Sequence, residues 1–308
     1  MQLLVSVSNA AEAKAALEGG ADYIDAKDPW AGALGAVSAA AFDRICDAVD
    51  RARPITAALG DLMDEATIEH AARRFAASGA AFVKLGFADA TRPRHVANLI
   101  RAAVRGAREG GAGRTGVVAV ACADKRAGEA PTPLVLVEVA ARAGAAGVLI
   151  DTTNKSGPGL RSLVDARDLC AFVTAAHEFG VFAALAGKLA PADLSFVHDT
   201  GADVAGVRGA ACDGGRHGSV SAWRVRRLRQ LMDAIECYSW SADRSSSTRP
   251  ASTTTGVTPA GIAREKYGST SESSGAPDVP GGLTRTSRDA PSEPATQAAM
   301  LSLVTSHE

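Results

Sequence analysis

Five lysines stand at or just after the ends of short apolar runs, and lysine is a residue type that can act as a nucleophile. They are Lys27, Lys84, Lys125, Lys155 and Lys188. If these runs are parallel strands of one closed sheet, their carboxyl ends meet around a single opening. Ammonium groups crowded there lower one another's pKa, and a neutral amine can attack a carbonyl to form an imine. The pattern predicts an enzyme that acts on phosphorylated carbonyl compounds.

Carboxylates accompany three of these lysines: Lys27, Lys155 and, less clearly, Lys125, which directly follows Asp124. Asp25 precedes Lys27 by two residues, so in a strand both side chains point to the same face. Asp151 precedes Lys155 in the same acid-then-amine order, at a longer spacing. Lys84 stands inside an apolar run, where burial is costly unless the amine reaches a polar cavity. We expect the catalytic group to consist of Asp25, Lys27, Lys84, Asp151 and Lys155. Plain ion pairs at strand ends are the alternative.

A second set of residues has the character of a phosphate site. Gly187 and Lys188 follow the seventh apolar run, and Arg208 and Gly209 follow the eighth. Barrel enzymes commonly bind phosphate through the loops after strands seven and eight. Glycine lets backbone N–H groups approach the anion. We expect these four residues to bind a substrate phosphate, with the downstream run 213–218 as a cap over the same site; ordinary turns are the alternative.

The elements that position these residues alternate along the chain. Apolar runs predict strands over 3–6, 23–26, 55–59, 81–86, 116–122, 147–151, 181–185 and 204–207. Helical periodicity, caps and prolines predict helices over about 9–19, 39–49, 64–77, 93–108, 133–143, 162–179, 191–200 and 219–237. Eight such units indicate a (β/α)₈ TIM barrel. A doubly wound sheet is the alternative, but the turn after the first strand lacks the Gly-rich nucleotide fingerprint.

The composition changes after about residue 238. Ser, Thr, Gly and Pro dominate from 239 to 308, and apolar periodicity ends. Such a segment cannot bury enough surface to offset its ordering entropy. We therefore expect a catalytic barrel domain over 1–238 and a disordered tail over 239–308. The apolar patch Ala298–Val304 is either a docking peptide or part of an unselected extension.

Bulk properties exclude several classes of function. The formal net charge of −1 argues against a general nucleic-acid or membrane-surface binder. No run approaches the about 20 apolar residues of a membrane span. Five scattered cysteines are typical of reduced thiols in a cytoplasmic protein. The six histidines form no metal-binding pattern and no nucleotide motif occurs, so we expect neither a metal nor a cofactor. A homo-oligomer remains open, because small barrels often associate through their helices.

Several of the lysine-bearing motifs resemble those of one known family. Residues 25–29, Asp-Ala-Lys-Asp-Pro, with Gly-Ala-Leu-Gly-Ala at 32–36, resemble the N-terminal signature of (5-formylfuran-3-yl)methyl phosphate synthase. This enzyme is also called 4-(hydroxymethyl)-2-furancarboxaldehyde-phosphate synthase, of methanofuran biosynthesis. Residues 83–86, Asp151-Thr152 with Lys155, and 185–189 resemble its other motifs. The resemblance covers about residues 1–238.

The resemblance implies a TIM-barrel carbon–oxygen lyase that acts on phosphates. Such an enzyme condenses two molecules of glyceraldehyde 3-phosphate, with loss of phosphate and water as a furan ring forms. Carried over by position, Lys27 is the Schiff-base lysine and Lys84 the proton acceptor. Asp25, Asp151 and Lys155 assist. The residues alone leave two alternatives: a class I Schiff-base aldolase on triose phosphates, and a non-catalytic phosphometabolite-binding protein that uses its tail to engage a partner.

Overall fold

Eight parallel strands close into a barrel in which each strand pairs with its neighbour in the chain and β1 pairs with β8. The computed structural model describes residues 1–246, apart from 61–63, 88–89, 91 and 127. The strands are β1 (Gln2–Val7), β2 (Tyr23–Ala26), β3 (Ile55–Ala58), β4 (Phe82–Gly86), β5 (Gly116–Cys122), β6 (Gly147–Asp151), β7 (Phe182–Leu185) and β8 (Val204–Val207). The predicted (β/α)₈ barrel is confirmed.

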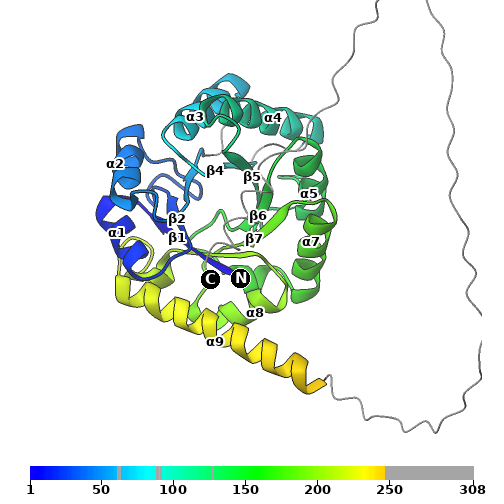
Figure 1. Ribbon diagram of the computed structural model, residues 1–308. Coiled ribbons are helices and arrows are strands. Elements are labelled where there is room, and N and C mark those ends of the chain that lie inside the picture. The colour runs from blue at the N-terminus through cyan, green and yellow to red at the C-terminus, as the bar shows by residue number, and fades with distance from the viewer. Residues whose placement is uncertain (61–63, 88–89, 91, 127, 247–308) are drawn as a thin grey trace, which may run out of the picture. The chain divides into compact units, whose positions relative to one another are not determined.

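Helices form a ring outside the strands (Figure 1). They are α1 (Ala10–Glu18), α2 (Ala39–Val49), α3 (Glu65–Ala77), α4 (Pro93–Gly110), α5 (Pro133–Arg142), α6 (Leu160–Leu163), α7 (Ala166–Glu178), α8 (Leu194–Asp199) and α9 (Ala222–Ser246). The side chains of Asn9, Ser38 and Asp64 cap the first turns of α1, α2 and α3 by accepting backbone N–H bonds. Proline opens α4 and α5, where a missing N–H costs nothing.

Two predicted helices differ from the observed ones. The helix predicted over 162–179 is two helices, because the Asp165 carboxylate accepts the N–H of Asp168 and starts α7 as a new helix. The last helix begins at Ala222 rather than Ser219, because residues 212–220 form a hairpin with strands β9 (Cys212–Asp213) and β10 (Ser219–Val220). Short 3₁₀ turns, η1 (Pro191–Asp193) and η2 (Gly209–Ala211), follow β7 and β8.

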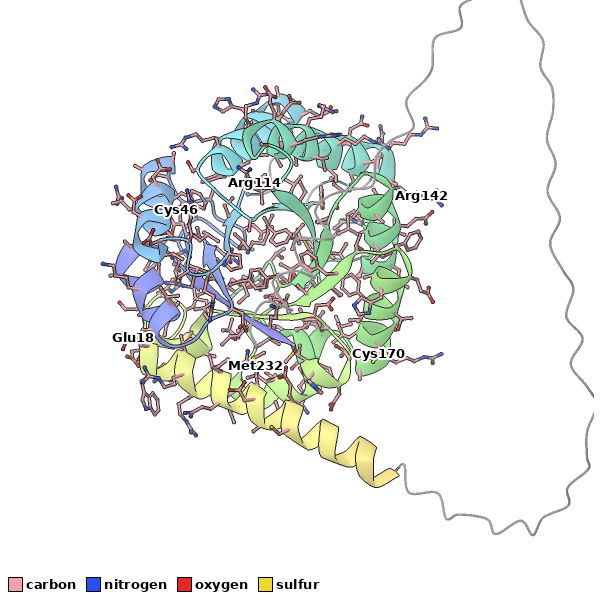
Figure 2. The ribbon with its side chains drawn as sticks, in the orientation of Figure 1. Glu18, Cys46, Arg114, Arg142, Cys170 and Met232 are labelled. Carbon is pink, nitrogen blue, oxygen red and sulfur yellow. The ribbon has the colours of Figure 1, made fainter. Side chains whose placement is uncertain are left out.

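The end of α9 lies beyond the expected domain boundary. The helix continues to Ser246, and no glycine or proline interrupts the sequence before Pro250. The remainder of the predicted tail, including the patch 298–304, lies outside the described residues. Within the described residues, no helix is long and apolar enough to cross a bilayer. Cys46 on α2 and Cys170 on α7 lie on opposite sides of the barrel, as Figure 2 shows.

Aromatic rings fill the barrel interior at the amino ends of the strands. Phe82 packs edge-to-face against Tyr23 and Phe182, with ring centroids 6.2 and 5.3 Å apart. Gly116 and Gly147 leave room for these rings: a Cβ atom at Gly116 would lie 2.8 Å from the ring of Phe82, and one at Gly147 would lie 2.5 Å from the ring of Phe182. Strand glycines therefore make space for an aromatic floor below the polar end of the barrel, and we call these three rings the aromatic floor.

Adding a methyl group beneath this floor tests the packing. Gly147→Ala is expected to lower the free energy of unfolding by about 1–3 kcal/mol, because the added methyl group collides with the ring of Phe182 and forces it out of its packed position. Urea denaturation measures the loss. In the double variant Gly147→Ala, Phe182→Leu, the smaller side chain relieves the clash, so the combined loss should fall below the sum of the single losses. Strict additivity would show that the two residues do not constrain each other.

Candidate active site

A cavity of about 330 Å³ opens at the carboxyl end of the barrel strands. Among the residues that the structure describes, its lining includes six basic side chains and only two acidic ones: Lys27, Lys84, Lys155, Lys188, Arg208, Arg216, Asp25 and Asp151. Lys84 within β4 and the three lysines that follow β2, β6 and β7 therefore share one cavity, as predicted. The excess of positive charge favours an anionic ligand.

The deepest ion pair joins β2 to β4. Lys84 Nζ lies 2.5 Å from Asp25 Oδ1, and both residues are buried. Ser6 and Thr56 donate their hydroxyls to the same carboxylate at 2.8 and 2.6 Å. Burial acts to raise the pKa of Asp25, but the ammonium groups of Lys84 and Lys27 and these hydrogen bonds outweigh it and hold the pKa below its usual range.

A second carboxylate stands between two lysines nearer the cavity opening. Asp151, at the end of β6, lies 3.3 Å from Lys27 Nζ through Oδ2 and 2.6 Å from Lys155 Nζ through Oδ1. Its Oδ1 also accepts the backbone N–H of Thr152. Burial opposes ionisation of Asp151, yet the two ammonium groups lower its pKa to about 2. The carboxylate is therefore ionised at neutral pH and stabilises the ammonium form of both lysines.

Two of the lysines are shifted toward the neutral form. Burial lowers the pKa of Lys84, aided by the charge of Lys27 and opposed by Asp25. Burial likewise lowers the pKa of Lys155 to about 8, with Asp151 opposing the shift and Lys27 adding to it. A free lysine titrates near 10.4, so such amines are neutral far more often at pH 7–8 than surface lysines are. The cavity thus holds amines able to act as nucleophile or base.

The loop after β6 is held by a neighbouring loop. Asp124, just after β5, accepts the backbone N–H groups of Thr153 and Asn154 at 2.7 and 2.6 Å. These bonds fix the turn that carries Lys155 toward Asp151. The adjacent Lys125 is not among the residues that line the cavity. The fifth lysine of the sequence pattern therefore does not join the other four.

The residues expected to bind phosphate all line the cavity, but they differ in what they offer. Gly187 has φ +109° and Lys188 has φ +56°, so the backbone turns sharply after β7 and reaches the cavity wall. The Lys188 ammonium donates to the carbonyl of Gly157 and is otherwise exposed. Gly209 begins the 3₁₀ turn after β8.

Arg208 is bound by the protein itself. Its guanidinium forms a two-armed ion pair with the buried Glu12, at 3.0 and 3.2 Å. Its other bonds go to the carbonyls of Ser6, Arg216 and Gly218. These five bonds match the five N–H donors of an arginine. In this state Arg208 joins β8 to β1 and to the hairpin, and its charge is neutralised by Glu12.

Sequence reasoning missed three polar residues of this region, Ser6, Glu12 and Thr56, and included Arg216 only within the run 213–218. Ser6 and Thr56 lie in strand register with Asp25, at Ser6↔Asp25 and Asp25↔Thr56. The signal in the sequence was a small hydroxyl residue within each strand that neighbours β2, the strand that carries Asp25. Glu12 and Arg216 contact partners remote in sequence, and no local pattern marks them. In the described part of the chain, no three His, Cys, Asp or Glu side chains are grouped as metal ligands.

Removing the shared carboxylate tests the electrostatic assignment. A lysine reacts with acylating reagents in its neutral form, so wild-type Lys155 should reach half-maximal labelling near pH 8. Asp151 favours the ammonium form, and Asp151→Asn should therefore move the midpoint to lower pH. Mass spectrometry of labelled peptides measures it, with exposed Lys14 on α1 as an internal control that should not change. An unchanged or higher midpoint for Lys155 contradicts the assignment.

Comparisons with known proteins identify the family of this chain. The model of the 4-HFC-P synthase family matches residues 3–229. The (5-formylfuran-3-yl)methyl phosphate synthase of Methanopyrus kandleri is 36% identical over 234 residues, which cover 75% of this chain and 98% of the relative. That of Methanothermobacter thermautotrophicus is 35% identical over 238 residues, covering 76% of this chain and 100% of the relative.

Solved structures with low sequence identity share the fold. The 3-hexulose-6-phosphate synthase of Salmonella typhimurium has a TM-score of 0.55 at 18% identity, covering 76% of this chain and 100% of that one. This likeness supports the barrel architecture alone. The family match spans the eight strands and every lysine and carboxylate of the cavity. The chain therefore belongs to the 4-HFC-P synthase family.

Proposed function

We propose that this chain condenses two molecules of glyceraldehyde 3-phosphate into (5-formylfuran-3-yl)methyl phosphate, a step toward methanofuran. The observation that carries the proposal is the contact of three lysines with two carboxylates inside one cation-rich cavity. The names of the relatives supply the product. The overall change releases one inorganic phosphate and two waters, keeps all six carbons, and requires no external oxidant or reductant.

Lys27 is proposed to form the Schiff base. Its amine attacks the aldehyde carbon of one triose phosphate, and loss of water gives an imine. The carboxylate of Asp151, 3.3 Å from Lys27 Nζ, is placed to accept a hydrogen bond from this nitrogen and to stabilise the positive charge of the protonated imine. Lys84 then removes a proton from the carbon beside the imine, which its lowered pKa favours. The resulting enamine forms the carbon–carbon bond to the second aldehyde.

Later steps eliminate water and phosphate and close the ring. Asp25 relays protons to and from Lys84, with which it is in direct contact. Lys155 and Asp151 form a second acid–base pair at the cavity opening. The two substrates bring close to four negative charges, which the excess of basic side chains offsets. Formation of an aromatic ring makes the last dehydration favourable.

Trapping the imine tests the role of Lys27. Borohydride added with glyceraldehyde 3-phosphate should leave a stable adduct that mass spectrometry places on Lys27. Lys27→Arg keeps the positive charge but lacks the nucleophile, so its kcat/KM should fall by at least about a thousandfold. Lys84→Ala should lose most activity yet still form an adduct on Lys27. Lys14→Ala, on the outer face of α1, serves as the control and should retain wild-type turnover.

The products separate this proposal from the alternatives. With glyceraldehyde 3-phosphate as the only substrate, the proposed lyase releases inorganic phosphate and builds a furan chromophore. A class I aldolase releases no phosphate and forms no furan. A non-catalytic binding protein shows neither product and no adduct. Normal turnover by Lys27→Arg, or an adduct on Lys84 in place of Lys27, would overturn the assignment of the nucleophile.

A further inference from the structure

Arg216 connects the hairpin after β8 to the loop after β2. It lies between β9 and β10, and its Nη2 donates to the carbonyls of Pro29 and Gly32 at 3.3 and 3.0 Å. Beside it, the rings of Trp30 and His217 stack with centroids 4.0 Å apart. The loop that begins directly after Lys27 is thus held from across the cavity opening by two neighbouring residues of the hairpin.

The two arginines of the cavity differ in how their charge is balanced. Arg208 is neutralised by the buried carboxylate of Glu12. Within the described residues, no carboxylate lies within 4.0 Å of the Arg216 guanidinium, and no protein acceptor takes a hydrogen bond from its Nε or Nη1. Arg216 is half-buried and lines the same cavity as Lys155 and Lys188. Asp151 acts on this charge only from beyond contact distance, so Arg216 offers its charge and its unused donors to an incoming ligand.

We propose that Arg216 binds a phosphate group of the substrate through Nε and Nη1 while its Nη2 remains on the loop after β2. Arg216 thereby selects phosphorylated aldehydes over neutral ones. This inference rests on the proposed function, whose substrate carries a phosphate, and it adds a contact outside the set Gly187, Lys188, Arg208 and Gly209.

The chemistry of the guanidinium determines the class of ligand. Its planar fork matches the oxygens of phosphate, and the bonds are charge-assisted. A carboxylate ligand has one charge, whereas phosphate brings close to two to a cavity lined by six basic and two acidic described side chains. The electrostatic attraction to this cavity is therefore stronger for a phosphate than for a carboxylate.

The hydrogen bonds of Arg216 Nη2 couple phosphate binding to the position of the loop after β2. Lys27 is followed at once by Asp28, whose N–H donates to the carbonyl of Gly35 and closes the loop. A phosphate bound to Arg216 fixes the guanidinium, and the guanidinium fixes the carbonyls of Pro29 and Gly32. Occupation of the site thus favours the loop position in which the Lys27 amine faces Asp151.

Inorganic phosphate is the probe for the first experiment. Isothermal titration calorimetry at constant ionic strength compares wild type with Arg216→Gln, which is expected to raise the phosphate dissociation constant about tenfold to a hundredfold or to remove one binding event. Arg224→Gln is the matched control, since Arg224 pairs with Asp213 beside the same hairpin and does not line the cavity. It should bind phosphate like wild type. An unchanged isotherm for Arg216→Gln overturns the proposal.

A second variant separates the guanidinium from the loop it holds. His217→Ala removes the stack on Trp30 but leaves Arg216 in place. It should bind phosphate within about twofold of wild type. If His217→Ala weakens phosphate binding as much as Arg216→Gln does, loop position rather than the guanidinium determines binding, and the proposal fails.

Selectivity in borohydride trapping gives an independent result. Arg216→Gln should raise the half-saturating concentration of glyceraldehyde 3-phosphate at least about tenfold and leave that of unphosphorylated glyceraldehyde unchanged. An equal loss with both aldehydes indicates a purely structural role and contradicts the proposal. The two hypotheses can fail separately. If phosphate binding depends on Arg216 but no furan forms, only the proposed function is contradicted. If Arg216→Gln forms the furan with wild-type kinetics, only this inference is contradicted.

Discussion

Mutual neutralisation of buried lysines and carboxylates is the interaction on which the rest of this site depends. An isolated ion in a barrel interior costs several kcal/mol, so neither Asp25 nor Lys84 would remain charged there alone. At a separation of 2.5 Å each charge favours the ionised form of the other, although burial still lowers the pKa of Lys84, and hydroxyls donate to the remaining acceptor sites of Asp25. The strands that carry them can therefore be apolar elsewhere and still supply polar chemistry at their ends. Loss of any one member leaves its partner as an uncompensated charge.

The charges are arranged so that the amines remain adjustable. Asp151 contacts Lys27 and Lys155 with its two oxygens, so a change in the charge of one amine alters the electrostatic environment of the other. An incoming phosphate adds negative charge and favours the ammonium forms, and its departure favours the neutral amines. Substrate binding and phosphate release can therefore alter the protonation of the lysines during the proposed reaction. This coupling follows from the contacts alone and needs no movement of the backbone.

Local sequence patterns predicted the barrel because strand length, helix periodicity and capping are properties of neighbouring residues. The strand-end lysines were also found, since position in a repeated unit determines which side chains meet. Partners far apart in the chain were not found. The ion pair of Arg208 with Glu12 was not predicted, because 196 residues separate the two and no local pattern marks the pairing. Arg216 was included only within a capping run, because its contacts with residues 29 and 32 depend on how a hairpin folds back.

The aromatic floor determines where ligands can enter and leave the cavity. Phe82 and Phe182 line the catalytic cavity on one side and a second cavity, at the opposite end of the barrel, on the other. Their rings lie between the two spaces, so the cavity of the candidate active site closes at the aromatic floor. In the proposed reaction, both substrates therefore enter and all products leave through the same opening between the strand-end loops. For the proposed reaction, a product that leaves slowly delays the next substrate, so product release rather than bond formation is expected to limit turnover.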